Sequence, residues 1–171
     1  QFFLNLYASP SLFMKTGSTQ PVKWKTFSAE LMEQSKKEKK PILLLFGTSW
    51  NYLTKKMDQE SFSNNEIASK INEAFIPIRI DAEELEPLFV KYQNIIMDMQ
   101  EESGLPLLVM CDFDIKAFFG GNYFPLVGVM GKPEITTILS DTLNSYKNEY
   151  PNVIKTKEYW IKKSSEKFFG K

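Results

Sequence analysis

Few side chains in this sequence are of the types that carry covalent or metal chemistry. The chain contains one cysteine, Cys111, and no histidine. A single thiol forms no intramolecular disulfide and runs no two-cysteine redox cycle. Without histidine, Ser-His-Asp and Cys-His catalysis are excluded, together with the commonest zinc and iron sites. Because Cys111 ends the apolar run from Leu107, we interpret it as a buried core residue. A single-thiol redox enzyme that uses Cys111 is the alternative.

The stretch from Pro41 to Met57 has the layout of a reactive site without its reactive groups. Residues 42–46 are all apolar, as in a strand buried on both faces, and Ser49 or Asn51 can cap a helix that follows. Proteins of the α/β class often place their chemistry at such a junction, because free backbone N–H groups collect there. The residues at this helix start include no cysteine, histidine or carboxylate: Trp50, Asn51, Tyr52, Leu53 and Thr54.

Two charged clusters have simpler interpretations than a ligand site. An acidic run follows residue 80 and comprises Asp81, Glu83, Glu84 and Glu86. Its spacing matches no calcium loop, so we interpret it as a solvated turn before a helix. Glu38 interrupts the lysine run 36–40, which suits the C-terminal end of a helix. We therefore predict no metal site, no cofactor and no nucleic-acid partner.

Size and composition indicate one globular domain with a substantial core. The chain has 171 residues, of which 43% are apolar, and its 21 basic residues equal its 21 acidic residues in number. This balance provides no overall field for nucleic acid or anionic membranes. No apolar run is long enough to span a bilayer, so we predict no membrane insertion. One thiol fits either side of a membrane, and no full signal segment is recognisable. The compartment stays open, with a cytoplasmic location favoured over an exported one.

The expected order of elements is that of the thioredoxin fold. Turn residues and apolar periodicity predict helices near 26–39, 51–57 (with a break near 58–62), 63–75, 87–99 and 133–146, and strands at 42–46, 76–81, 107–111 and 117–119. This order gives a three-layer α/β fold, with a central mixed sheet and helices on both faces. In this layout a cis proline precedes the first hairpin strand, so we expect a cis bond before Pro106 in the loop ahead of Leu107.

Three segments are expected. Residues 1–24 form an N-terminal arm that packs on the domain, which we expect to be irregular and held by Leu12 and Phe13. Residues 25–150 form the thioredoxin-like domain. Residues 151–171 form a C-terminal helical extension, whose helix spans Val153 to Phe169.

Several short motifs, in order, resemble the thioredoxin-like domain of the spermatogenesis-associated protein family. They are Ser9–Phe13, Pro21–Trp24, Lys40–Ile42, Met57 with Glu60–Phe62, Asn72–Phe75, Gly104–Leu107 and Phe118–Pro125. The resemblance covers the chain from Ser9 to about Tyr150. It implies the thioredoxin fold and the packing of the aromatic motif 118–125 around a glycine turn.

The resemblance also shows what this chain has replaced. Where the family carries a Cys-x-x-Cys pair flanked by histidines, this chain has Asn51 and Thr54, with Tyr52 and Lys55 at the histidine positions. Such a pair works because the helix N-terminus lowers the pKa of the first thiol. Asn51 and Thr54 have no comparable ionisation, so we predict no catalytic residues and no disulfide oxidoreductase activity.

The resulting hypothesis is a redox-inactive thioredoxin-fold domain that binds a protein or a peptide. Its candidate binding surface consists of Trp50, Asn51, Tyr52, Leu53, Leu105 and Pro106. The alternatives are the single-thiol enzyme and a structural or assembly subunit that associates through the charged C-terminal segment. The oligomeric state and the identity of the partner stay open.

Overall fold

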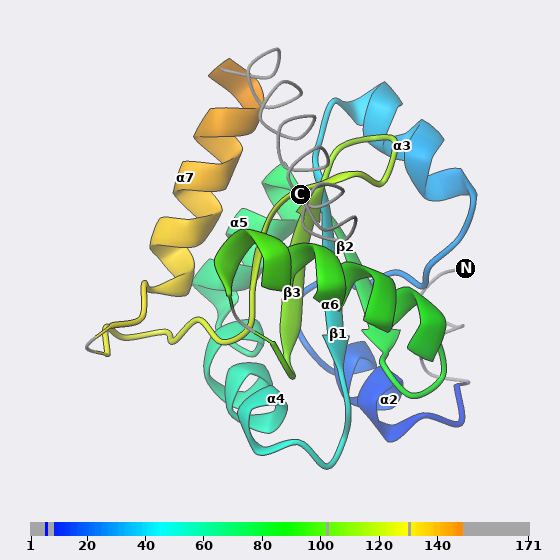
Figure 1. The fold of residues 1–171 in the computed structure, drawn as a ribbon, viewed down its shortest axis with the longest axis vertical. Coiled ribbons are helices and arrows are strands. Elements are labelled where there is room, and N and C mark those ends of the chain that lie inside the picture. The colour runs from blue at the N-terminus through cyan, green and yellow to red at the C-terminus, as the bar shows by residue number, and fades with distance from the viewer. Residues whose placement is uncertain (1–5, 7–8, 102, 130, 149–171) are drawn as a thin grey trace, which may run out of the picture.

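Four strands form a mixed sheet at the centre of the described residues (Figure 1). The computed structural model describes residues 6, 9–101, 103–129 and 131–148. The strands are β1 (Ile42–Gly47), β2 (Ile76–Asp81), β3 (Leu107–Cys111) and β4 (Ala117–Gly121), in the spatial order β2-β1-β3-β4. β1 is parallel to β2 and antiparallel to β3, and β3 pairs with β4 as a hairpin.

The helices of the described residues follow the expected order along the chain. They are α2 (Leu12–Ser18), α3 (Glu30–Glu38), α4 (Tyr52–Met57), α5 (Asn65–Ala74), α6 (Glu86–Gln100) and α7 (Ile135–Asn148), with a π-helical segment η1 (Asp58–Phe62) between α4 and α5. The break expected near residues 58–62 is therefore a change of helix type and not a loop.

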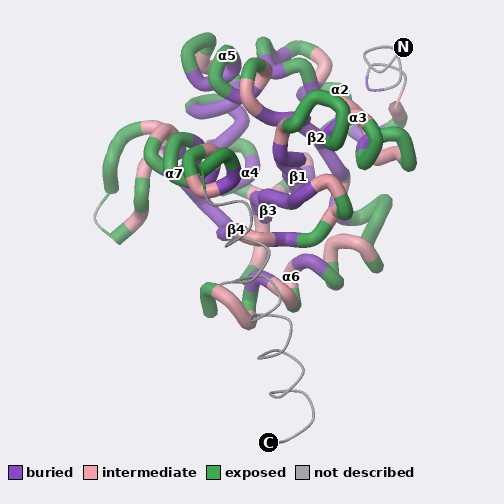
Figure 2. Tube along the Cα trace, turned by 90° about the horizontal axis from the view of Figure 1, so that it is seen from above, coloured by how far each residue is buried: buried purple, intermediate pink, exposed green. Residues whose placement is uncertain are grey.

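Strand side chains alternate between two apolar layers, because successive residues of a strand point to opposite faces. Leu43, Leu45, Leu108 and Met110 belong to a core shared with α2, α5 and α7. Ile42, Leu44, Phe46 and Val109 belong to the other core, which contains Leu31 of α3 and Tyr92 and Ile96 of α6. In Figure 2 the inner strands are buried, and exposed residues lie on the outer sides of the helices. The predicted three-layer α/β fold is confirmed.

The N-terminal segment differs from the irregular arm that we expected. Ser11 caps α2 by accepting a hydrogen bond from the Met14 N–H, so residues 12–18 are helical. Leu12 is 66% exposed and does not anchor the segment, whereas Phe13 is buried in the core. Further on, Lys25 forms a parallel bridge with Ile78 and extends the sheet beyond β2.

A buried ion pair joins this segment to the sheet. Arg79 of β2 is fully buried and donates two hydrogen bonds to Asp58 of η1, at 2.7 and 2.8 Å, and one to the Phe13 carbonyl oxygen, at 2.8 Å. Gln20 donates to Asp58 and accepts from the Trp24 indole. Because a buried charge needs such partners, this network fixes α2 and Trp24 against the sheet.

Two helices begin later than the sequence predicted. The helix expected near 26–39 begins at Glu30, and its N-cap residue is Ala29. The helix expected at 63–75 begins at Asn65, and Asn64 caps it by accepting from the Glu66 and Ile67 N–H groups. The predicted helix Val153 to Phe169 lies outside the described residues.

The aromatic motif 118–125 packs as expected, for a different reason. Phe119 and Phe124 lie with ring centroids 6.1 Å apart. A Cβ atom on Gly120 would come within 2.3 Å of Ile96, and one on Gly121 within 2.4 Å of Phe124. Gly120 and Gly121 are therefore required because neighbouring side chains approach them closely. Backbone freedom is not the reason, since the described glycines with positive φ are Gly104 and Gly131.

Candidate functional site

The register of the sheet brings the α4 start and the loop before β3 to the same edge. Phe46 of β1 pairs with Leu107 of β3, and β1 ends one residue later while β3 begins there. The chain that enters α4 therefore lies beside the loop 104–106. The Leu105–Pro106 peptide bond is cis, which is the isomer that the sequence predicted.

Asn51 caps the start of α4. Its Oδ1 atom accepts hydrogen bonds from the backbone N–H of Thr54, at 2.9 Å, and from the Thr54 hydroxyl, at 3.0 Å. Thr54 is only 2% exposed, and its methyl group lies where a Cβ atom on Gly47 would clash with it. Asn51 and Thr54, which the sequence analysis predicted to stand at the Cys-x-x-Cys positions, therefore act as a helix cap and a packing residue.

The three apolar side chains at this helix start face solvent. Trp50 is 63% exposed, Tyr52 is 72% exposed and Leu53 is 36% exposed. The Trp50 indole N–H donates to Glu83 Oε1 at 2.7 Å, which ties the ring to the acidic turn after β2. Large apolar side chains that gather at one exposed place are a common mark of an interaction surface.

The loop before β3 is fixed by a residue that sequence reasoning missed. Asn122, just after β4, donates to the Gly104 carbonyl oxygen at 2.7 Å and to the Pro106 carbonyl oxygen at 3.2 Å. Gln93 of α6 accepts from the Gly104 N–H. The signal that could have identified Asn122 is its place within the aromatic motif, where a buried amide is conspicuous.

Leu105 and Pro106 contribute differently to this edge. Pro106 is buried, and Leu105 is partly exposed. Neither the backbone N–H nor the carbonyl oxygen of Leu105 has a hydrogen-bond partner among the described residues. An extended peptide that passes this loop would find a free donor and a free acceptor there.

The acidic run after β2 and the cysteine of β3 have structural roles. Asp81 accepts from the Glu83 and Glu84 N–H groups and closes the predicted turn. Cys111 is 0% exposed in β3. Burial, together with the nearby Cys111, raises the pKa of Tyr92, whose hydroxyl donates to the Ile115 carbonyl oxygen at 2.6 Å.

The described residues offer neither a cluster of metal ligands nor a membrane-spanning helix. They contain no group of three or more cysteine, aspartate or glutamate side chains placed to hold a metal ion. None of the helices in that part of the chain is both long enough and apolar enough to cross a membrane.

The fold and this site together define a thioredoxin-like domain that lacks the Cys-x-x-Cys pair. A solved structure of DsbH oxidoreductase superimposes on it with a TM-score of 0.54, covering 74% of this chain and 85% of that chain at 20% identity. The chain belongs to the family described as "Protein of unknown function, DUF255", whose model matches residues 4–164.

Curated relatives agree with this assignment. The chain is 31% identical to spermatogenesis-associated protein 20 of Rattus norvegicus and 32% identical to that of Mus musculus, each over 127 residues. These alignments cover 74% of this chain and 16% of either relative. The family resemblance predicted from the motifs is confirmed, and the chain spans about a sixth of the length of these relatives.

Proposed function

We propose that this thioredoxin-like domain binds an extended peptide segment of a partner protein and performs no dithiol chemistry. The surface is the one predicted from the sequence: Trp50, Asn51, Tyr52, Leu53, Leu105 and Pro106. The observation that carries the proposal is that the Asn51 side chain caps the start of α4 while Trp50 and Tyr52 are exposed beside it.

The backbone of Leu105 supplies the second part of the proposal. A peptide in extended conformation would pair with its free N–H and carbonyl groups and place alternate side chains toward Trp50 and Leu53. Asn122 keeps the loop in place from the buried side. Main-chain pairing would then supply affinity, and the exposed aromatic rings would supply preference for apolar residues.

Peptide selection followed by affinity measurement tests this surface. A display library of random extended peptides is selected on the full chain, and the selected peptides are measured by fluorescence anisotropy on Trp50→Ala and on Leu105→Pro, which removes the free N–H. We expect each variant to weaken binding by about tenfold or more. Met97→Ala, an exposed apolar change on α6, is the matched control and should bind as the unaltered chain does.

Two results would reject the proposed surface. One is a set of selected peptides that bind Trp50→Ala and Leu105→Pro as tightly as the unaltered chain. The other is a library from which no peptide is retained. If the pure chain accelerated insulin reduction, the proposal that it performs no dithiol chemistry would be wrong.

The single-thiol alternative has a direct test of its own. Because Cys111 is fully buried in β3, we expect alkylation of the native protein by iodoacetamide to be much slower than alkylation of the denatured protein. A native rate equal to or above the denatured rate would favour a reactive thiol instead.

A further inference from the structure

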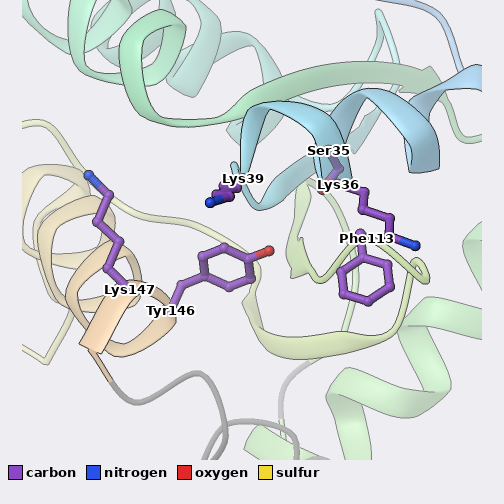
Figure 3. Close-up of a pocket in the computed structure, with 6 residues that line it drawn as sticks. All are labelled: Ser35, Lys36, Lys39, Phe113, Tyr146 and Lys147. Atoms are coloured by element: carbon purple, nitrogen blue, oxygen red, sulfur yellow. The ribbon is translucent and has the colours of Figure 1, made fainter.

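A cavity lies at the end of the sheet opposite the proposed peptide surface. Its volume is about 440 Å³, and it is lined by Ser35, Lys36, Lys39, Phe113, Tyr146 and Lys147 (Figure 3). α3 leads into the amino end of β1, and Phe113 follows Cys111, which pairs with Ile42 at that same end. Asn51 follows the other end of β1, about 20 Å away along a strand of six residues.

The lining combines aromatic walls with positive charge. Phe113 comes from the turn after β3 and Tyr146 from α7, while Lys36 and Lys39 come from the last turn and the C-cap of α3. Lys36 Nζ lies 5.8 Å from the centre of the Phe113 ring. In the view of Figure 3 the Tyr146 side chain lies between those of Lys147 and Phe113, with its hydroxyl on the Phe113 side.

Among the described residues, the lysines of this cavity have no acidic partner. The described residues that line it include no aspartate or glutamate. The described part of the chain forms no salt bridge with Lys36, Lys39 or Lys147. Three ammonium groups around one cavity repel one another, and a bound anion would relieve this repulsion.

We propose that this cavity binds a small organic anion that carries a planar aromatic ring. The ring would lie against Phe113 and beside Tyr146, whose own ring stacks on Phe118 with centroids 5.8 Å apart. The anionic group, a carboxylate or a phosphate, would face Lys36 and Lys39. The volume falls in the range of small-molecule sites, which are largely apolar and carry a few polar groups that orient the ligand. The simpler reading is that these lysines only complement the C-terminal end of α3.

The experiment uses anilinonaphthalene sulfonate, a fluorescent aromatic anion, on the full chain. We expect saturable binding that is weakened about tenfold in the double variant Lys36→Met, Lys39→Met and also weakened in Phe113→Ala. Lys37→Met is the matched control, because Lys37 is an exposed lysine of the same helix turn that does not line the cavity. If the lysines only complemented the C-terminal end of α3, Lys37→Met would weaken probe binding as much as a change at Lys36.

Displacement identifies the chemical class of ligand. Phenyl phosphate or benzoate should displace the probe, and benzyl alcohol, which has the ring without the charge, should not. Equal displacement by all three, equal binding by the double variant and Lys37→Met, or no saturable binding would each overturn the proposal. Trp50→Ala should leave probe binding unchanged, so the outcome is independent of the proposed peptide surface.

Discussion

Asn51 caps the start of α4 at a position where the family resemblance predicts a cysteine. A cysteine at a helix N-terminus uses the free N–H groups to stabilise a thiolate. The amide oxygen of Asn51 uses the same Thr54 N–H group to cap the helix. Asn51 therefore supplies a cap and no nucleophile at this helix start, beside which Trp50 and Tyr52 are exposed.

Asp58 is expected to be the most sensitive single position of the described core. Asp58→Ala leaves the guanidinium of Arg79 buried without its bidentate partner, so we expect a loss of about 3–5 kcal/mol in the free energy of unfolding. Urea denaturation measures the loss. The control is Glu60→Ala, an exposed carboxylate of the same η1 segment, which should change stability by less than about 0.5 kcal/mol. Similar losses in both variants would contradict the buried ion pair.

Tyr92 is expected to make stability fall at alkaline pH. Burial raises its folded-state pKa above the usual value of 10.0, so above that pH the unfolded chain releases the proton while the folded chain keeps it. The unfolded state then binds fewer protons, and stability decreases with rising pH by up to about 1.4 kcal/mol per pH unit. Below pH 10.0 this contribution is fully present.

Tyr92→Phe separates this effect from other alkaline changes. The variant loses the hydrogen bond to Ile115, about 1 kcal/mol at neutral pH, and should show a shallower decline above pH 10.0 in urea titrations. A decline as steep as that of the unaltered chain would show that Tyr92 titrates normally in the fold.

Gly17 is needed in α2 because the Arg79 side chain packs against it, and not because its backbone requires the freedom of glycine. Gly17 lies in α2, where Ala would ordinarily be preferred by about 1 kcal/mol. A Cβ atom at this position would come within 2.4 Å of Arg79 Cδ, and the Arg79 side chain is held by its hydrogen bonds. The tertiary contact therefore opposes the helix propensity.

Gly17→Ala is accordingly expected to destabilise the protein by about 1–3 kcal/mol. Thermal unfolding followed by circular dichroism measures the change. Lys15→Ala, at an exposed position of the same helix, should leave the midpoint nearly unchanged. An increase in stability for Gly17→Ala would mean that Arg79 moves aside without cost.

Across the whole molecule, the N-terminal segment is an integral part of the core. Phe13, Val22 and Trp24 are each at most 1% exposed, and the Phe13 carbonyl oxygen and the Gln20 side chain accept hydrogen bonds from Arg79. Each buried large side chain contributes roughly 1.5–3 kcal/mol, in a fold whose total stability is about 5–15 kcal/mol.

Removal of residues 1–24 should therefore abolish cooperative unfolding in urea, since it removes these side chains and leaves Arg79 partly unpaired. Removal of residues 1–5, which precede the buried Leu6, is the control and should retain one cooperative transition. A cooperative transition of unchanged midpoint in the longer deletion would show that the segment is an independent arm.

Periodicity and turn chemistry predicted the order of the elements, because helices and strands leave local patterns in the chain. That order matches the thioredoxin layout, and the layout in turn predicted the sheet class and the cis bond before Pro106. The same reasoning misplaced Leu12 and overlooked Asn122, Asp58 and Arg79. Those roles depend on contacts between residues separated by 16 to 66 positions, such as Arg79 with Phe13 and Asn122 with Pro106.

The cavity between α3 and α7 also depends on contacts between residues that are far apart in the chain. In the sequence, Lys36 and Lys39 are only the charged end of a helix, and Tyr146 is only one residue of an apolar stripe. Folding brings them together with Phe113, because the sheet places the end of α3 and the turn after β3 at one edge. Local pattern determined which elements form, and only the tertiary structure decided which side chains meet, since long-range packing has no periodic signal in the chain.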